Sequence, residues 1–460
     1  MARRNSSYDY DLIVIGSGAG GGVGANLAAS MGKKVAIFEE EAVVGGECPN
    51  WACVPTKALL HAAERYEQVQ SANNYGIKAT AVGFDYKKVK EWKDLVVKRT
   101  GTAEGDKAFF DAGIEVHHEH AHFINPHEIS AGGKRYRAKK FLLATGTHNF
   151  IPPIEGLEET GYITFREAID LTKVPKTLFV IGGGAIGCEF AQLFNSFGVE
   201  VTMVELAPRL LGREEPEAAE LVKAVFKNRG INVITGGAIH SLKSKAGRKV
   251  IKYTDGKQEH EITVDEVLVA SGKRANTDIG LDNAGVKFSK FGITTNHFMQ
   301  TSAKHIYAAG DCVGPYQFTH TASYQSRLAA HNMYSRKQNK IAVDYRAIPR
   351  TVFVSPEVAS VGMTESELRN LGVKVKVGIS PISVIGRSNT EDKQTGFVKI
   401  IANQKKKILG AAIVAPRAGE MIHELGLAIK LNATTTQVAE MIHAFPTWNE
   451  AIRIAAHKIR

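Results

Sequence analysis

Two glycine-rich turns of the same pattern constrain the fold of this 460-residue chain more than any other feature. The first lies in DLIVIGSGAGGGVGANLAASMGKKVAIFEE, where the pattern G-x-G-x-x-G is formed by Gly16, Gly18 and Gly21. The second lies in KTLFVIGGGAIGCEFAQLFNSFGVEVTMVEL, where the same pattern is formed by Gly182, Gly184 and Gly187. Each stretch predicts a short buried strand, a tight turn, a helix and a second strand.

This glycine spacing is typical of a Rossmann-like dinucleotide-binding unit. The first glycine makes the tight turn, the second lets the backbone approach a pyrophosphate, and the third lets the helix pack closely on the sheet. The free amides at the start of the helix then point at the phosphates. Two such units predict two bound nucleotides, such as a flavin and a nicotinamide, with a degenerate structural repeat as the alternative for one copy.

An acidic residue ends the second strand of each unit. Glu39 and Glu205 each lie 23 residues after the first glycine of their motif, where a carboxylate binds a ribose hydroxyl. A carboxylate at this place would repel a 2′-phosphate. Glu205 in the second unit therefore predicts NAD(H) rather than its phosphorylated form.

Two of the four cysteines, Cys48 and Cys53, lie in GGECPNWACVPTK, directly after the first unit. A structural zinc site would need further ligands, and the spacing Cys-x4-Cys is wider than that of the usual zinc-binding pair. Nearby histidines keep the zinc alternative open: His117, His118, His120 and His122. The other two cysteines, Cys188 and Cys312, are interpreted as buried packing residues.

A redox couple accounts for the cysteine spacing better than a metal does. Five residues of regular helix rise about 7.5 Å, which exceeds the roughly 7 Å between Cα atoms that a disulfide spans. A bridge therefore requires a distorted first turn, with which Pro49 is compatible, and a strained bridge is more easily reduced. A helix start favours the thiolate formed on reduction, and Lys57 adds a positive charge on the same helical face as Cys53. We interpret the pair as a working redox disulfide.

Composition excludes some classes of protein. The formal net charge of +11 could favour nucleic acid, but the basic residues are scattered. The one tight basic run, Lys405 to Lys407, is predicted to be a hairpin turn, so neither nucleic acid nor a membrane is expected as a partner. The basic N-terminal segment has an apolar run too short for a signal peptide, and four cysteines in a chain of this length suggest a reducing compartment. The protein is therefore predicted to be cytoplasmic.

Several further motifs follow in a characteristic order. They are LLATGT (142–147), TSAKHIYAAGDC (301–312), FTHTA (318–322) and a C-terminal stretch beginning IPRTVFVSPEVASVGMTESEL. Together with the glycine turns and the redox segment, they resemble the flavoprotein pyridine nucleotide-disulfide oxidoreductases, a family that includes dihydrolipoamide dehydrogenase, glutathione reductase and mercuric reductase. The resemblance extends over nearly the whole chain.

The resemblance implies the architecture. It implies an α/β fold with two Rossmann-like dinucleotide-binding domains, for FAD and for NAD(H), and a C-terminal α+β dimerisation domain. The FAD-binding domain would comprise residues 1–150, with the redox disulfide, and 276–345. The NAD(H)-binding domain would comprise residues 151–275, and residues 346–460 would form the interface of a homodimer. Residues near 57–110 would form a helical excursion within the first piece.

The resemblance also assigns residues. The expected FAD contacts are Gly16, Gly18, Gly21, Glu39, Gly45, Gly46, Lys57, Thr145, Gly146, Asp311 and His320. The expected NAD contacts are Gly182, Gly184, Gly187, Glu205 and Gly272. Lys57 and Glu189 correspond to a buried pair beside the flavin. Reducing equivalents would pass from NADH through FAD to Cys53, and Cys48 would be the interchange thiol that meets the substrate.

The sequence departs from the family in HAFPTWNE (443–450). In lipoamide and glutathione reductases a histidine acid–base precedes this proline, and a glutamate five residues later orients it. Here the position is Phe445 while Glu450 remains, so general acid–base help is missing from its usual place. His443 is either a substitute or a structural histidine, and the second reading is favoured. The C-terminal cysteine pair of mercuric reductases is also missing, because no cysteine follows Cys312.

The sequence thus predicts an NADH-dependent FAD disulfide reductase of the dihydrolipoamide dehydrogenase and mercuric reductase type. Reduction of its acceptor should need little general acid–base catalysis. The acceptor would be a small-molecule disulfide, a quinone or a metal ion. The alternatives are a true dihydrolipoamide dehydrogenase that uses His443, and a redox-sensing or structural flavoprotein.

Overall fold

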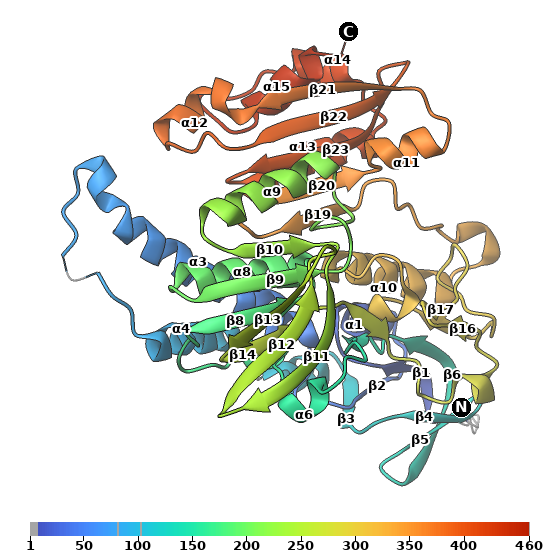
Figure 1. Ribbon diagram of the computed structural model, residues 1–460. Coiled ribbons are helices and arrows are strands. Elements are labelled where there is room, and N and C mark those ends of the chain that lie inside the picture. Colours follow the sequence, from blue (N-terminus) through green and yellow to red (C-terminus); the bar gives the residue numbers. More distant parts are fainter. Residues whose placement is uncertain (1–7, 81, 102–103, 460) are drawn as a thin grey trace. The chain divides into compact units, whose positions relative to one another are not determined.

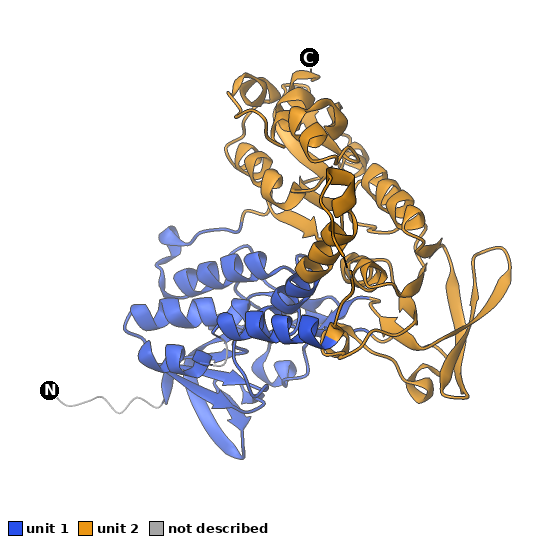
Figure 2. Ribbon diagram, turned by 90° about the vertical axis from the view of Figure 1, so that its left-hand side faces the viewer, with its two compact units in different colours: residues 1–59, 87–150, 272–343 blue, residues 60–86, 151–271, 344–460 orange. Residues whose placement is uncertain are grey.

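The computed structural model describes residues 8–80, 82–101 and 104–459 (Figure 1). It contains two compact units, which are coloured separately in Figure 2. The first unit comprises residues 1–59, 87–150 and 272–343, and the second comprises residues 60–86, 151–271 and 344–460. Each unit is therefore assembled from segments that are far apart in the sequence. The basic residues 1–7, which entered the signal-peptide argument, lie outside the described residues.

A parallel sheet forms the centre of the first unit. Its strands are β3 (Ile114–His118), β2 (Val35–Glu39), β1 (Tyr10–Ile15) and β6 (Lys134–Leu143), in that spatial order, with β18 (Ile306–Ala308) also on β6. From Leu12 to Ile15 the strand β1 is apolar, as expected of a strand covered on both faces, and Leu12, Ile13 and Val14 are fully buried. The helices α1 (Ala19–Ser30) and α10 (Thr319–Tyr334) contribute to the core on one side.

Shorter elements complete the first unit. The far end of β6 continues into an antiparallel extension with β5 (Glu128–Ala131) and β4 (His122–Asn125). The strands β7 (Thr147–Asn149) and β15 (Lys273–Ala275) pair antiparallel, as do β16 (Phe288–Ser289) and β17 (Gly292–Ile293). The short helices are α2 (Glu47–Asn50), α5 (Gly105–Asp111), η3 (Leu281–Ala284), η4 (Asp311–Val313) and η5 (Lys337–Asn339). Two longer helices cross the boundary between the units: α3 (Cys53–Gln70) and α4 (Tyr86–Arg99).

The second unit contains a second parallel sheet. Its strands are β10 (Asn232–Thr235), β9 (Glu200–Glu205), β8 (Thr177–Ile181) and β14 (Glu266–Val269), in that spatial order. The helix α8 (Ala185–Ser196) connects β8 to β9, and α9 (Pro216–Asn228) connects β9 to β10. An antiparallel sheet follows, made of β11 (Ala238–Lys245), β12 (Arg248–Thr254) and β13 (Glu259–Val264). Other helices of this unit are η1 (Ala72–Tyr75), α6 (Leu157–Thr160) and α7 (Phe165–Ala168).

The C-terminal part of the second unit is an antiparallel sheet with helices packed on it. The strand order is β19 (Pro349–Val352), β20 (Glu357–Gly362), β23 (Ile408–Ala415), β22 (Phe397–Asn403) and β21 (Val375–Pro381). Its apolar core includes residues of α13 (Ala418–Lys430) and α15 (Glu450–His457). The remaining helices are α11 (Glu365–Asn370), η6 (Ile382–Val384), α12 (Gly386–Thr390) and α14 (Thr435–Glu440). The fold class predicted from the sequence is confirmed, as is the hairpin turn at Lys405 to Lys407, which joins β22 to β23.

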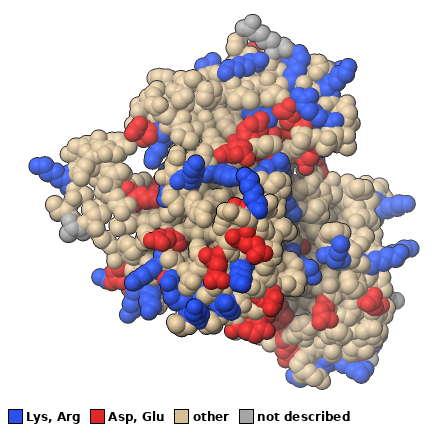
Figure 3. All heavy atoms as spheres, in the orientation of Figure 1, with Lys and Arg blue, Asp and Glu red and all other residues tan. Residues whose placement is uncertain are grey.

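The surface combines charges of both signs. On the face shown in Figure 3, lysine and arginine side chains are interspersed with aspartate and glutamate. Among the residues that the structure describes, no helix is both long and apolar enough to cross a membrane.

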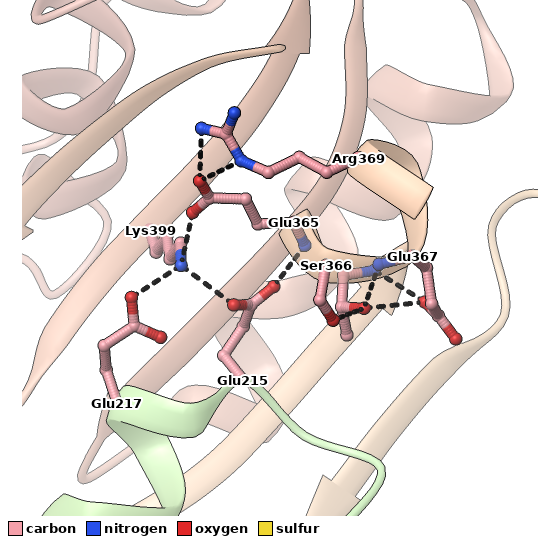
Figure 4. A network of polar contacts seen from close by, with 8 residues as sticks. Glu215, Glu217, Glu365, Ser366, Glu367, Arg369 and Lys399 are labelled. Carbon is pink, nitrogen blue, oxygen red and sulfur yellow. Dashed lines mark hydrogen bonds and ion pairs between the residues drawn. The ribbon is translucent and has the colours of Figure 1, made fainter. Parts of the chain in front are cut away.

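In the second unit, a cluster of charged side chains connects the strand β22 to the start of the helix α9 (Figure 4). Lys399 on β22 is 1% exposed, and its Nζ lies 2.8 Å from Glu215, 2.7 Å from Glu217 and 2.9 Å from Glu365. Arg369 binds Glu365 from the other side. The three carboxylates have the spacing of a metal site, but the lysine ammonium contacts all three and supplies the positive charge there. Burial alone would lower the pKa of Lys399, but the hydrogen bonds to these carboxylates outweigh burial and raise it.

Removal of this ammonium should destabilise the protein strongly. Lys399→Met leaves the buried carboxylate of Glu215 without its cationic partner, so we expect the free energy of unfolding to fall by about 3 kcal/mol or more. Lys405→Met, in the exposed turn after β22, is the matched control and should change it by less than about 0.5 kcal/mol. Chemical denaturation followed by circular dichroism measures both. Equal effects of the two substitutions would contradict a stabilising role of the cluster.

Candidate flavin site and cysteine pair

The first glycine turn brings the start of α1 against the end of β1. Gly16 has φ +95°, and a Cβ atom there would lie 2.3 Å from the carbonyl oxygen of Ala144. A Cβ atom on Gly21 would lie 1.9 Å from the carbonyl oxygen of Gly16, so no larger residue fits between helix and strand. None of the described side chains caps the helix at Gly18, and its first turn holds no acidic residue. The first amides of α1 are therefore available to an anionic group such as a pyrophosphate.

A buried serine connects this turn to the acid at the end of β2. Oε2 of Glu39 accepts hydrogen bonds from the Ser17 amide (2.8 Å) and from Ser17 Oγ (2.6 Å). The same Oγ accepts a hydrogen bond from the Gly45 amide at 2.9 Å. Ser17 thus ties the glycine turn to both the acid and the segment that carries the cysteines. Sequence reasoning did not single it out, because a serine at a variable position of the motif carries no signal of its own.

The cysteine segment packs directly on the first glycine turn. Gly46 has φ +71°, and a Cβ atom there would lie 2.8 Å from the Cα atom of Gly18. The short helix α2 contains Cys48 and ends at Asn50, and the long helix α3 begins anew at Cys53. Because the helix is interrupted between the two cysteines, their sulfurs are not held a full helical rise apart. This is the irregular start that the spacing required for a bridge.

The two sulfurs are neighbours. The Cys48 thiol forms a side-chain hydrogen bond with Cys53. That hydrogen bond, burial and the charge on Cys53 raise the pKa of Cys48, while Thr319 and the positive charge of Lys57 act in the opposite direction. The raised pKa of Cys48 favours the protonated form of this thiol in the reduced pair. Cys53 Sγ also lies 3.6 Å from Thr319 Oγ1 at the start of α10.

An acidic residue follows the strand β18 in the same unit. Burial raises the pKa of Asp311 to about 6; the positive charge of Lys273 opposes this rise and the negative charge of Glu47 adds to it. Lys273 and Glu47 form an ion pair with each other. Glu47 precedes Cys48 directly, so the pair links β15 to the cysteine segment. The Asp311 carboxylate can accept hydrogen bonds from the hydroxyl groups of a bound ligand.

The segment after β6 is held by the segment after β15. Thr145 Oγ1 donates to the carbonyl of Asn276 at 2.7 Å, and the Asn276 amide side chain donates to the carbonyl of Thr145 at 2.8 Å. Gly146 has φ +67°, and its carbonyl accepts from the Asn276 amide at 3.0 Å. Asn276 could not be selected from the sequence, because its partner Thr145 is 131 residues away along the chain. Gly272, predicted with the NAD set, lies in the first unit and accepts from the Phe150 amide.

His320 was predicted to lie at the helix start aimed at the flavin. It is the second residue of α10, it is exposed, and its ring stacks on that of Phe318 with 5.4 Å between the centroids.

The second glycine turn repeats the first in the second unit. A Cβ atom on Gly182 (φ +108°) would lie 2.5 Å from the carbonyl oxygen of Ala270, and one on Gly187 would lie 2.0 Å from that of Gly182. The space beside Gly184 is open, since no described atom comes within 4 Å of its ideal Cβ position. Glu205 accepts hydrogen bonds from the Gly183 and Ala207 amides. A carboxylate can accept further bonds, so this geometry suits a ribose hydroxyl.

Three residues predicted to manage charge or protons, Glu189, His443 and Glu450, lie in the second unit. Glu189 on α8 is buried, and its Oε1 accepts from the Phe353 amide at 2.9 Å. His443 has a partner at each ring nitrogen: the carbonyl of Met441 at 3.0 Å and Glu424 Oε1 at 3.0 Å. Phe445 is 77% exposed, and Glu450 opens α15. His443 is thus oriented by Glu424, a residue that the sequence did not indicate.

The structure gathers the predicted site residues into two groups. The first unit holds the cysteine pair, Lys57, Gly272 and the whole set assigned to FAD, and the second unit holds the other NAD residues with Glu189, His443 and Glu450. The proposed pairing of Lys57 with Glu189 stays a prediction, since the two belong to different units. Among the described residues, Cys48 and Cys53 do not form a metal-sized cluster with the nearby histidines. His118, for example, is held by the carbonyl of Glu41 and by Asp106.

The site thus consists of two glycine turns, each at a helix start that none of the described side chains caps, and a cysteine pair beside the first turn. Comparison with known proteins identifies the family. Residues 10–326 match the family model described as pyridine nucleotide-disulphide oxidoreductase, and residues 348–456 match the dimerisation domain of the same family. The chain belongs to this family of FAD-dependent oxidoreductases, which use NAD(P)H and a redox-active cysteine pair.

Individual relatives cover nearly the whole chain. A dihydrolipoyl dehydrogenase from Thermus scotoductus is 37% identical over 98% of this chain and 97% of its own length. A mercuric reductase from Staphylococcus aureus is 34% identical over 98% of this chain and 83% of its own length. Among solved structures, the flavoprotein disulfide reductase RclA from Escherichia coli, in complex with Cu(II), has a TM-score of 0.87 at 26% identity. That alignment covers 98% of this chain and 99% of RclA.

Proposed function

We propose that this protein is a homodimeric, NADH-dependent FAD disulfide reductase. Its acceptor would be one whose reduction needs little help from a general acid–base group of the protein. The single observation that carries the proposal is Phe445, an exposed and non-titratable side chain where relatives such as lipoamide reductases have an acid–base histidine. An NADH-coupled screen of lipoamide, glutathione disulfide, coenzyme A disulfide, quinones and metal ions tests it. Rapid turnover of lipoamide above all the others would contradict it.

We propose the domain boundaries that the sequence predicts. Residues 1–150 and 276–345 would bind FAD, residues 151–275 would bind NADH, and residues 346–460 would form the interface. The match to the family dimerisation domain supports the dimer. Exposed apolar side chains in that region suit burial against a second copy: Leu427, Leu431, Ile442 and Phe445. We propose that the protein acts in the cytoplasm, because four cysteines in a chain of this length suit a reducing compartment.

The proposed site roles rest on the contacts described above. The glycine turns, with Glu39 and Glu205, would hold the two nucleotides, and Asp311 would accept hydrogen bonds from hydroxyls of the flavin side chain. Bound FAD supplies the capacity to accept a hydride and pass on two electrons. Cys53 would receive those electrons and keep the negative charge, and Cys48 would give up its proton and attack the acceptor as a thiolate. Lys57 would stabilise the negative charge beside it.

Three classes of acceptor fit the proposed function. A disulfide with acidic leaving thiols, a quinone or a metal ion would each spare the protein a general acid. The relatives named mercuric reductase and the Cu(II) complex of RclA support a metal ion. Residues 313–460 hold no cysteine, so these residues offer no counterpart of the C-terminal cysteine pair of mercuric reductases. The 37% identity to a dihydrolipoyl dehydrogenase favours lipoamide as the second candidate.

NADH should be preferred over NADPH. Glu205 would accept from a ribose hydroxyl, whereas the 2′-phosphate of NADPH would meet its negative charge. The ratio of kcat/KM for NADH to kcat/KM for NADPH measures this preference. Glu205→Ala should lower this ratio. A tenfold or greater preference of the natural protein for NADPH would overturn the assignment.

Phe445→His should raise lipoamide turnover by on the order of tenfold or more. The substitution places an imidazole five residues before Glu450, so that a general acid can protonate the leaving thiol. Quinone reduction should change little, because it leaves no thiol to protonate. Steady-state rates with both acceptors measure the effect.

The matched control is Phe445→Asn, which introduces a polar side chain that cannot titrate and should leave lipoamide turnover low. If the natural protein already turns over lipoamide rapidly, with Phe445→His neutral and His443→Ala inactive, then His443 is the acid–base group. That result would favour the second candidate.

A further inference from the structure

One hydroxyl contacts both sulfurs of the cysteine pair. Thr319 Oγ1 lies 3.6 Å from Cys53 Sγ, and the same side chain forms a hydrogen bond with Cys48. Thr319 is the first residue of α10, a helix of 16 residues, whereas Cys53 is the first residue of α3. Two helix starts therefore meet at the sulfurs, and the threonine hydroxyl lies where they meet.

The hydroxyl is not needed to cap its helix. The N-cap of α10 is Phe318, and none of the described side chains donates or accepts a capping hydrogen bond there. The first turn of α10 contains no acidic residue that would repel negative charge. A threonine hydroxyl carries one proton that it can donate, and Cys53 Sγ lies within hydrogen-bonding distance of it at 3.6 Å.

We infer that Thr319 is a further catalytic residue, which donates a hydrogen bond to the Cys53 thiolate and thereby stabilises the reduced form of the pair. The inference rests on the proposed redox role of Cys48 and Cys53. It goes beyond that role by naming the group that holds the charge in place.

The reduction step shows why such a donor is useful. Two electrons, supplied by NADH through the bound FAD, break the bond between Cys48 and Cys53 and leave an electron pair on each sulfur. One proton is taken up by Cys48, so the reduced pair carries one negative charge, on Cys53. Oxidised sulfurs accept hydrogen bonds weakly, whereas a thiolate is a charged acceptor, so the Thr319 hydroxyl favours the reduced state.

The pH midpoint of the first ionisation of the reduced cysteine pair reports on the strength of this hydrogen bond. The experiment uses the FAD-loaded protein after anaerobic reduction with NADH. The rate of alkylation by iodoacetamide and the long-wavelength absorbance of a thiolate beside the flavin are both followed against pH. Thr319→Val removes the hydroxyl at nearly constant shape, and its midpoint should move up by about one pH unit, a tenfold loss in the ratio of thiolate to thiol.

Three further variants make the result specific. Thr319→Ser keeps the hydroxyl and should stay near the natural midpoint. Thr321→Val, two residues later, removes a buried hydroxyl that has no partner among the described residues, and it should also leave the midpoint unchanged. If Thr319→Val does not fold, Thr319→Ala removes the same hydroxyl without a branched side chain and should show the same shift.

The outcomes separate this inference from the proposed function. An unchanged midpoint in Thr319→Val, or equal shifts in Thr319→Val and Thr319→Ser, would overturn the role of the hydroxyl. If NADH generates no reactive thiol at Cys48 or Cys53 in the natural protein, the proposed function itself fails.

Discussion

The close approach of helix and strand at the glycine turns is the constraint on which the rest of the structure depends. At Gly21 and Gly187 a single added carbon would lie about 2 Å from a backbone oxygen, closer than atoms pack. Only glycine lets α1 and α8 begin at the ends of β1 and β8, and only this placement turns the free amides of each helix towards one spot. Substitution at either position would therefore separate helix from sheet and remove the anion site together with the fold around it.

From the first turn the constraint extends to the cysteines. Gly46 lies against Gly18, and Ser17 hydrogen-bonds both Glu39 and the amide of Gly45. The cysteine segment is thus positioned by the same turn that would hold a pyrophosphate. The break between α2 and α3 then brings Cys48 beside Cys53, and the start of α10 adds Thr319. A nucleotide site and a thiol pair are in this way parts of one arrangement of helix starts.

Periodic and local signals were readable from the sequence, and long-range partners were not. The two glycine motifs predicted both parallel sheets because each motif is contiguous and its spacing has one structural meaning. Ser17, Asn276 and Thr319 were not singled out, because their partners come from distant segments and their residue types are common. The cluster around Lys399 was missed for the same reason, since its carboxylates come from α11 and from the start of α9. The orientation of His443 by Glu424 shows the same limit.

The central claim is that NADH delivers two electrons to the sulfurs of Cys48 and Cys53. The most direct measurement is anaerobic addition of one equivalent of NADH to the oxidised protein, followed by iodoacetamide and mass spectrometry of the cysteine peptides. The account predicts that Cys48 and Cys53 are unlabelled before NADH and become labelled after it, while the buried Cys188 and Cys312 stay unlabelled throughout. If the flavin is reduced but the labelling of Cys48 and Cys53 does not change, the account is contradicted.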